Sequence, residues 1–243
     1  MPVTAQPIPI LQDNYAWLLR DAATGRRAVV DPADADAVIQ AVDAAGDGLD
    51  LILLTHHHDD HVAGVDAVRR RYSCPVVGAA ADARRLPRLD RGVAEGDLVE
   101  LGGSAARVID TPGHTRGHIS FAFEGDDPVL FSGDTLFSLG CGRLLEGTPA
   151  EMFASLRKLA ALPPDTLVCC GHEYTQSNAR FALSVGPASP ALQARADEVG
   201  RLRAEGRPTV PSRLGDEMAA NPFLRAPDVA TLAALRAGKD RFQ

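Results

Sequence analysis

The amino-acid sequence predicts an α/β fold followed by a helical C-terminal region. Short apolar runs that end in a tight turn, such as residues 51–54 and 129–131, have the pattern of buried strands. Beyond about residue 176, apolar residues instead recur three or four positions apart, as on the buried face of a helix. Two such series are Leu192, Ala196, Val199 and Leu202, and Val229, Leu232 and Leu235. The 243 residues suffice for one large domain with an appendage, so we expect domains of residues 1–175 and 176–243.

The N-terminal segment is expected to form strands and then a helix. Residues 3–30 contain short apolar stretches broken by turns, and the last stretch ends at Asp31. The helix is predicted by apolar residues at helical spacing, namely Ala35, Val38, Ile39 and Val42. Since Asp31 precedes this helix, we expect it to cap the helix rather than to take part in chemistry.

Residues 55–61, Thr-His-His-His-Asp-Asp-His, connect a predicted strand to a helical pattern that begins at Val62. Imidazole nitrogen and carboxylate oxygen are the ligands that zinc and its first-row neighbours accept when no thiolate is present. In an extended loop, His56 and His58 point the same way, whereas the adjacent Asp60 and His61 diverge. The segment can therefore serve two metal ions. A chance polar loop or a tag is the alternative, and the interior position and interleaved aspartates disfavour it.

Candidate ligands recur where other predicted strands end. Residues 106–109 precede His114, residues 129–131 precede Asp134, and residues 167–170 precede His172. Open α/β sheets gather their functional sites at the carboxyl ends of strands, so convergence on one cleft is expected. Five of the seven histidines lie at these strand ends: His56, His58, His61, His114 and His172.

The two remaining histidines are His57 and His118. We expect His57 to face away from its neighbours and to hydrogen-bond the scaffold. His118 lies four residues after His114 and is expected to orient a ligand from behind. An ordinary core histidine is an equally good interpretation for either residue.

Composition excludes several classes of protein. A net charge of −7 argues against a general nucleic-acid binder, which needs a basic surface. No apolar run approaches the ~20 residues of a membrane helix, and residues 1–17 lack the pattern of a signal peptide. The four cysteines are too few and too irregular for a disulfide framework, so we expect reduced thiols and a cytoplasmic protein. They are Cys74, Cys141, Cys169 and Cys170.

Four motifs together resemble the metallo-β-lactamase superfamily. They are residues 55–61, Thr-Pro-Gly-His-Thr at 111–115, Ser-Gly-Asp-Thr at 132–135 and Gly-His-Glu at 171–173. The resemblance implies a four-layer αβ/βα sandwich. It also implies one metal ion on His56, His58 and His114, and a second on Asp60, His61 and His172. Asp134 and a hydroxide that acts as the nucleophile would bridge the two ions, which are expected to be zinc, with iron or manganese as alternatives.

Further segments resemble the glyoxalase II, or hydroxyacylglutathione hydrolase, family. They are residues 141–148, 171–175, 221–225 and 236–242. The resemblance implies that the helical region covers the cleft and holds glutathione through Arg143, Tyr174, Arg236 and Lys239. The family often has an aromatic residue at the position of Leu145, which puts one glutathione contact in doubt.

Physical reasoning on these cations leaves two roles open. Glutathione carries two carboxylates, and arginine pairs with carboxylates through paired hydrogen bonds. Arg236 and Lys239 share one face if the helix continues past Gly238. Alternatively, the helix ends there and the cations only complement its dipole.

The expected activity is hydrolysis of S-(2-hydroxyacyl)glutathione, typically S-D-lactoylglutathione, to D-lactate and glutathione. This reaction is the second step of methylglyoxal detoxification. Metal coordination lowers the pKa of water to about 7, and a thiol of pKa near 8.5 leaves without an obvious general acid. The alternatives are a glutathione persulfide dioxygenase, another hydrolase of this fold such as a lactonase, and a metal-stabilised binding module. We expect a monomer that acts on a small molecule and binds neither nucleic acid nor membrane.

Overall fold

The computed structural model describes residues 3–46 and 48–242, and these residues form two six-stranded sheets. The strands of the first sheet lie in chain order, with β1, β2 and β3 antiparallel and β3 to β6 parallel. They are β1 (Val3–Ile10), β2 (Asn14–Asp21), β3 (Arg27–Val30), β4 (Leu51–Leu53), β5 (Val76–Ala79) and β6 (Arg91–Val93). The strands predicted within residues 3–30 are therefore confirmed.

The second sheet has the order β14-β13-β10-β9-β8-β7. Its strands are β7 (Leu98–Leu101), β8 (Ser104–Asp110), β9 (Ile119–Phe123), β10 (Val129–Gly133), β13 (Leu167–Cys170) and β14 (Ser212–Arg213). A ribbon of β11 (Leu136–Phe137) and β12 (Gly140–Cys141) lies between β10 and β13 in the chain. Because β10 and β13 are parallel, their carboxyl ends meet at the same edge of the sheet.

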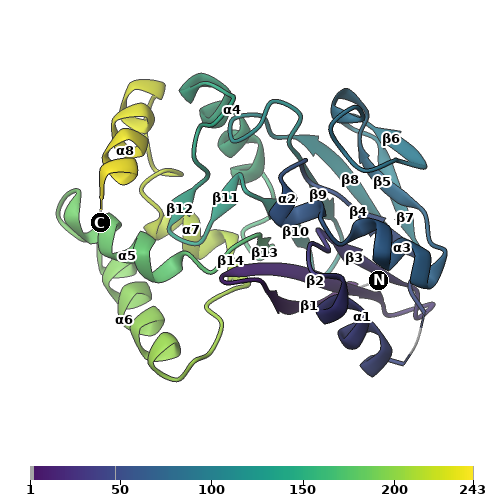
Figure 1. Ribbon diagram of the computed structural model, residues 1–243. Helices are drawn as coiled ribbons and strands as arrows, with labels where there is room; N and C mark the ends of the chain where they lie inside the picture. Colours follow the sequence, from purple (N-terminus) through teal and green to yellow (C-terminus); the bar gives the residue numbers. More distant parts are fainter. Residues whose placement is uncertain (1–2, 47, 243) are drawn as a thin grey trace.

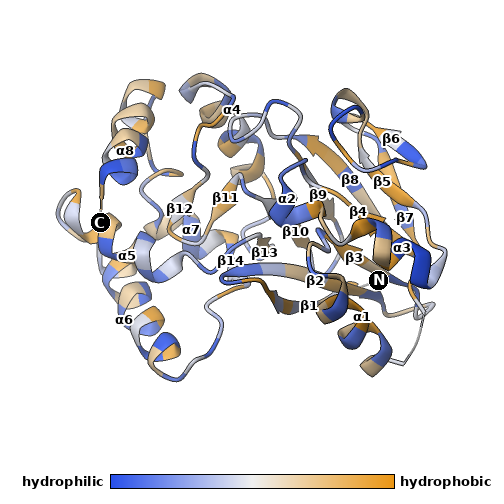
Figure 2. Cartoon of the chain, viewed as in Figure 1, coloured by the Kyte–Doolittle hydropathy of each residue, from blue (hydrophilic) through white to orange (hydrophobic). Residues whose placement is uncertain are grey.

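Helices cover the outer faces of the sheets and form the C-terminal region (Figure 1). The helical elements are α1 (Ala35–Ala44), α2 (Asp59–Val62), α3 (Val65–Tyr72), the 3₁₀ turn η1 (Ala80–Asp82), α4 (Pro149–Ala160), α5 (Thr175–Ser184), α6 (Pro190–Ala204), α7 (Leu214–Ala220) and α8 (Val229–Arg241). The strands are largely apolar, whereas helices such as α1 and α6 alternate apolar and polar residues (Figure 2). No helix among the described residues combines the length and the apolar character that a membrane span requires.

Alternation along the second sheet shows how the layers form. Val108 and Phe131 belong to the core that the first sheet also lines. Their neighbours Ile109 and Leu130 belong to a second core, against α4 and the C-terminal helices. Successive side chains of a strand point to opposite faces, so the second sheet is buried on both sides. With α1 and α3 packed against the first sheet, the predicted four-layer αβ/βα sandwich is confirmed.

The helix predicted after β3 is confirmed as α1, but its cap is a different residue. Asp34 is the N-cap, and its side chain accepts from the backbone N–H groups of Asp36 and Ala37. The capping role predicted for Asp31 is therefore wrong. Asp31 has a left-handed backbone conformation with φ of 52°, and its carboxylate points away from the helix toward Thr55 and His61.

The segment that carries the histidines also differs from expectation. Residues 55–58 are irregular as predicted, but Asp60 and His61 lie on the short helix α2. The helical pattern that starts at Val62 is interrupted before α3 at Gly64, where an added Cβ would lie 2.4 Å from the carbonyl oxygen of Pro32. Only glycine fits there, and the chain turns between the two helices.

The C-terminal helices gather beside the carboxyl ends of β10 and β13 (Figure 1). The two predicted apolar series lie on α6 and α8, and β14 joins the edge of the second sheet. Helix α8 continues through Gly238 to Arg241, so the prediction of one shared face for Arg236 and Lys239 holds.

Candidate active site

The first group of candidate ligands consists of three histidine ring nitrogens. His56 and His58 follow β4, and His114 follows β8. His58 Nδ1 lies 3.1 Å from His56 Nε2 and 3.0 Å from His114 Nε2. All three atoms lie within 4.8 Å of one another, so one ion can contact all of them.

The second group comes from α2 and from the end of β13. The Oδ2 atom of Asp60 lies 3.8 Å from His61 Nε2 and 3.5 Å from His172 Nε2. Asp60 and His61 therefore converge, and the predicted divergence of their side chains is wrong because they occupy a helical turn rather than an extended loop. The segment nevertheless contributes to two groups, as expected.

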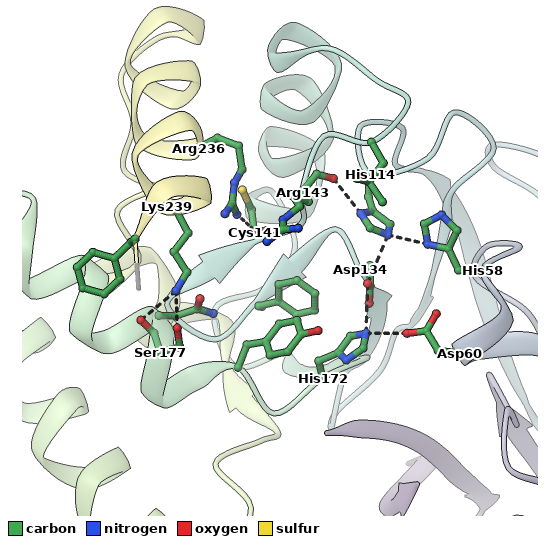
Figure 3. A pocket seen from close by; sticks show the side chains of 15 residues that line it. His58, Asp60, His114, Asp134, Cys141, Arg143, His172, Ser177, Arg236 and Lys239 are labelled. Atoms are coloured by element: carbon green, nitrogen blue, oxygen red, sulfur yellow. Dashed lines mark hydrogen bonds and ion pairs between the residues drawn. The ribbon is translucent and has the colours of Figure 1, made fainter. Parts of the chain in front are cut away.

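Asp134 lies between the two groups (Figure 3). Its Oδ1 is 3.4 Å from His61 Nε2. Its Oδ2 is 3.3 Å from His172 Nε2 and 3.4 Å from His114 Nε2. The structure thus brings every predicted metal-ligand residue to one edge of the sandwich.

Two unpartnered atoms show that these residues fit bound cations. His61 Nε2 and Asp134 Oδ1 are buried and have no hydrogen-bond partner among the described residues. A buried polar atom without a partner costs free energy, which a cation in contact with both groups would recover. Gly171 keeps the space open, since an added Cβ would lie 2.5 Å from Asp134 Oδ1. Histidine and carboxylate donors suit divalent zinc, iron and manganese.

One carboxylate orients a histidine of each group. Asp31 Oδ2 accepts from the Thr55 hydroxyl at 2.6 Å and from His61 Nδ1 at 2.9 Å. Since the Thr55 hydroxyl proton goes to Asp31, its oxygen accepts from His56 Nδ1 at 3.0 Å. Both imidazoles then carry their proton on Nδ1 and direct the Nε2 lone pair into the site.

His172 and His114 are oriented in the same way. Asp13 Oδ1 accepts from His172 Nδ1 at 3.0 Å, and the carbonyl oxygen of Arg143 accepts from His114 Nδ1 at 2.8 Å. The sequence reasoning missed the roles of Asp31 and Asp13. Asp31 had a usable signal, since it follows an apolar strand as the candidate ligands do.

His57 and His118 support the site from behind. The Nδ1 atom of His57 lies 3.0 Å from Asp82 Oδ2, so the predicted scaffold contact is confirmed. His118 Nε2 accepts the backbone N–H of Asp134 at 3.0 Å. It therefore fixes the loop that presents Asp134, as the orienting interpretation expected.

Electrostatics couple the two groups. Burial opposes the charge on Asp134, but the imidazoles of His172 and His61 outweigh burial and lower the pKa of Asp134 well below its usual range. Burial also opposes protonation of His172, yet Asp134, Asp13 and Asp60 raise its pKa to about 9. In contrast, burial and neighbouring imidazoles lower the pKa of His56. A cation bound at Asp134 would thus displace the proton of His172, and the negative charge of Asp134 would then stabilise the cation instead of the protonated imidazole.

A cleft of about 510 Å³ leads from these groups to helix α8. In Figure 3 the candidate ligands His58, Asp60 and His172 lie at one end, and Arg236 and Lys239 project from α8 at the other. The cleft is lined by His58, Asp60, His114, Asp134, Phe137, Cys141, Arg143, Leu145, His172, Tyr174, Ser177, Asn178, Arg236, Lys239 and Phe242. All of the residues predicted to contact glutathione line it.

The cations of the cleft are held by neighbouring oxygens. Arg236 is buried and donates to the carbonyl of Cys141 at 2.7 Å and to Asp240 at 2.9 Å. Asp240 also lies 3.5 Å from the exposed Arg143. Lys239 donates to the hydroxyl of Ser177 on α5 at 2.6 Å. The cations are thereby held at one wall of the cleft, and Asp240, to which sequence reasoning gave no role, contacts both arginines.

Two side chains flank the path between the cations and the candidate ligands. Tyr174 stacks on His172 with ring centroids 4.5 Å apart and an interplanar angle of 7°. Leu145 lies at the rim with 57% of its surface exposed, so it is available for contact with a bound molecule.

Comparison with known proteins gives matches over nearly all of the chain. Residues 11–172 match the metallo-beta-lactamase superfamily, and residues 173–242 match the hydroxyacylglutathione hydrolase C-terminus. A hydroxyacylglutathione hydrolase of Acidiphilium cryptum (strain JF-5) is 59% identical over 239 residues, covering 98% of this chain and 97% of that protein. The chain belongs to the hydroxyacylglutathione hydrolase family. The described C-terminal helices α5 to α8 make up most of the part that matches this family specifically.

Solved structures share the fold of this chain. The crystal structure of ETHE1 from Myxococcus xanthus shares the fold, with a TM-score of 0.70, 24% identity, and coverage of 98% of this chain and 90% of that one. The protein TTHA1623, crystallised in a di-iron-bound form, has a TM-score of 0.62 and 28% identity, with coverage of 90% and 99%. Together with the two groups of histidine and aspartate ligands, the family supports binding of divalent metal ions.

Proposed function

We propose that the protein hydrolyses the thioester of S-(2-hydroxyacyl)glutathione, with S-D-lactoylglutathione as the typical substrate, and releases the 2-hydroxy acid and glutathione. The observation that carries this proposal is the juxtaposition of two ligand groups around Asp134 with a cationic wall at the other end of the same cleft. The family match of both parts of the chain supports it.

The candidate ligands suit the chemistry of the reaction. His56, His58 and His114 would hold one ion, and Asp60, His61 and His172 a second, with Asp134 shared. When bound, these ions supply a Lewis acid and a water whose pKa is lowered to about 7, so that hydroxide is available at neutral pH.

The remaining steps fall to the protein's own side chains. Asp134 is ionised because nearby imidazoles lower its pKa, and it is for the same reason too weak a base to remove a proton from water. Its carboxylate can instead accept a hydrogen bond from a water in the site and orient that water toward the thioester. Burial raises the pKa of Tyr174, so its phenol stays protonated and can donate to glutathione. The leaving thiol has a pKa near 8.5 and departs as thiolate, which removes the need for a general acid.

The cationic wall suits the glutathione half of the substrate. Arg143, Arg236 and Lys239 can pair with its two carboxylates, and Asp240 keeps the arginines in place before the substrate arrives. We propose on this basis that residues 1–175 carry the chemistry and residues 176–243 bind glutathione.

Thiol release tests the proposal. Metal-replete protein should liberate thiol from S-D-lactoylglutathione far above the buffer rate, and the Arg236→Gln/Lys239→Gln variant should raise KM by about 10-fold at nearly unchanged kcat, as loss of binding common to ground and transition states predicts. Arg241→Gln, an exposed residue of the same helix, is the matched control and should leave KM unchanged. A lactonase would retain its lactone activity in the double variant. Absence of thiol release, or an equal effect of the control, would overturn the proposal.

The pH dependence of substrate binding gives a separate prediction for Lys239. Burial, together with the charges of Arg236, Arg180 and Arg143, lowers the pKa of Lys239 to about 8. The ammonium group that attracts a carboxylate is therefore present below pH 8 and lost above it. We expect kcat/KM to fall about 5-fold between pH 7 and pH 9, as loss of about 1 kcal/mol of ion pairing predicts. Lys239→Arg should abolish this fall, because guanidinium stays charged. An identical pH profile in the variant would contradict the prediction.

Three finer assignments accompany the proposed function. We propose zinc as the metal, since histidine-rich sites favour it, with iron or manganese as alternatives. We propose a monomer that acts in the cytoplasm, and the four cysteines, all buried and free of disulfides, support a reducing compartment. Metal analysis and the elution volume on size exclusion test the first two assignments.

A further inference from the structure

A second recess lies beside the cleft and is not used by the reaction described above. It has a volume of about 740 Å³ and is lined by Ala81, Asp82, Arg84, Arg85, Arg116, Gly117, Leu145 and Glu146. Leu145, which is exposed, also lines the cleft, so the two spaces adjoin at this side chain. The recess is thus next to the reaction centre.

The acids of the recess are already neutralised. Arg85 donates to Asp82 at 2.5 Å and to both carboxylate oxygens of Glu146, at 2.5 Å and 3.1 Å. His57 contacts the same two acids, at 3.0 Å and 3.5 Å. These contacts form a closed ring, and Arg85 is fully engaged in it.

The other two arginines of the recess are available for a ligand. Arg84 and Arg116 are exposed, and neither guanidinium has a hydrogen bond or an ion pair within residues 3–46 and 48–242. Arg116 acts on Glu151 only at longer range, where the Thr148 hydroxyl is the main cause of the lowered pKa of Glu151. Three arginines against two carboxylates leave the recess cationic in a chain of net charge −7.

The recess adjoins the loop that carries His114. Figure 3 places His58 and His114 at the end of the cleft remote from Lys239. Arg116 follows His114 by two residues, and the backbone N–H of Glu146 donates to the carbonyl of His114 at 3.2 Å. If glutathione lies on the wall of α8 and the thioester carbon at the ligand groups, the acyl chain is the half of the substrate left to extend past Leu145 toward the recess.

We propose that this recess is a subsite for a carboxylate at the far end of the acyl chain, bound by Arg84 and Arg116. The inference rests on the proposed function and extends its substrate class to glutathione thioesters of dicarboxylic acids. A lactoyl group is too short to occupy a space of this size, whereas a longer chain can pass Leu145. Arginine recognises carboxylates through paired hydrogen bonds, which fits an end group rather than the chain itself.

The test compares two thioesters of equal length and different charge. S-adipoylglutathione and its terminal primary amide are assayed by thiol release, with S-D-lactoylglutathione as the reference substrate. We expect the wild-type kcat/KM to be about 5-fold higher for the adipoyl thioester than for the amide, as an exposed ion pair allows. In Arg84→Gln/Arg116→Gln this preference should disappear while lactoylglutathione turnover stays unchanged. Arg88→Gln, an exposed arginine outside the recess, should retain the preference.

Several outcomes would overturn the subsite. They are equal wild-type rates for the two long thioesters, an unchanged preference in the double variant, and loss of the preference in Arg88→Gln. A parallel loss of lactoylglutathione turnover, or weaker product inhibition by glutathione in the double variant, would assign the recess to the peptide half instead. Failure of the proposed function is distinguishable, because lactoylglutathione would then not be hydrolysed by the wild-type protein.

Discussion

Asp134→Asn should lower kcat/KM for the glutathione thioester by about 10³-fold, equivalent to about 4 kcal/mol of transition-state stabilisation. Asp134 is the one predicted ligand whose carboxylate reaches both groups, with contacts of 3.3–3.4 Å to His61, His114 and His172. An amide keeps the shape but removes the negative charge that the two cations would share. We expect bound metal to fall from two ions to at most one per chain.

The matched control for Asp134 is Asp59→Asn. Asp59 belongs to the histidine segment but is exposed and lies outside both ligand groups. The Asp59→Asn variant should have a metal content and a turnover within about 2-fold of the wild-type values, as expected for a surface substitution. Thermal unfolding of both variants separates loss of chemistry from loss of fold. A folded Asp134→Asn variant with two metal ions and near-normal turnover would show that Asp134 is not the shared ligand.

Asp31→Asn should cost about 10- to 100-fold in metal affinity or in turnover, the usual range for a group that orients metal ligands. The carboxylate accepts three hydrogen bonds, from the Thr55 amide and hydroxyl and from His61. An asparagine must turn its NH₂ group toward at least one of these donors. The resulting conflict would release His61 directly and His56 through Thr55, so that both ligand groups are affected by one substitution.

Asp34→Asn provides the control for Asp31. The two aspartates are three residues apart, but Asp34 caps helix α1 and does not face the site. Asparagine is an equally good N-cap, so stability and turnover should be unchanged. Metal affinity is measured by calorimetric titration of the wild type and of Asp31→Asn. Equal affinities in the two proteins would contradict the orienting role of Asp31.

The clustering of the candidate ligand residues could be predicted from sequence because their positions depend on local patterns. Each of three apolar strands is followed by a candidate ligand, namely His114, Asp134 or His172. The ends of these strands lie at the same edge of the sheet, so the three side chains come together there, as the contacts of Asp134 with both histidines show. The helical C-terminal region follows for the same reason, since its apolar spacing is regular.

The residues that hold these ligands could not be predicted, because their contacts join distant parts of the chain. Asp31 reaches His61 across 30 residues, and Asp13 reaches His172 across 159. Asp31 also precedes a helix, and the local capping pattern favoured the wrong role. Its positive φ, which directs the side chain back toward Thr55, is visible only in three dimensions.

The backbone conformation of the histidine segment, residues 55–61, likewise could not be predicted from local sequence patterns. Asp60 and His61 converge because residues 59–62 form a helical turn, which Gly64 ends by packing against the carbonyl of Pro32. The presence of glycine at position 64 in the sequence does not reveal that the carbonyl group of Pro32 packs against it. The segment contributes candidate ligands to two groups, as predicted, but through a helical turn rather than the extended loop that the prediction assumed.

Metal analysis combined with a thiol-release assay on the same freshly purified protein tests the central claim most directly. We expect about two equivalents of divalent metal per chain, and thiol release from S-D-lactoylglutathione that is lost on chelation and restored on metal addition. Thioester hydrolysis that persists in fully metal-free protein, or two bound metal ions without any thiol release, would contradict it.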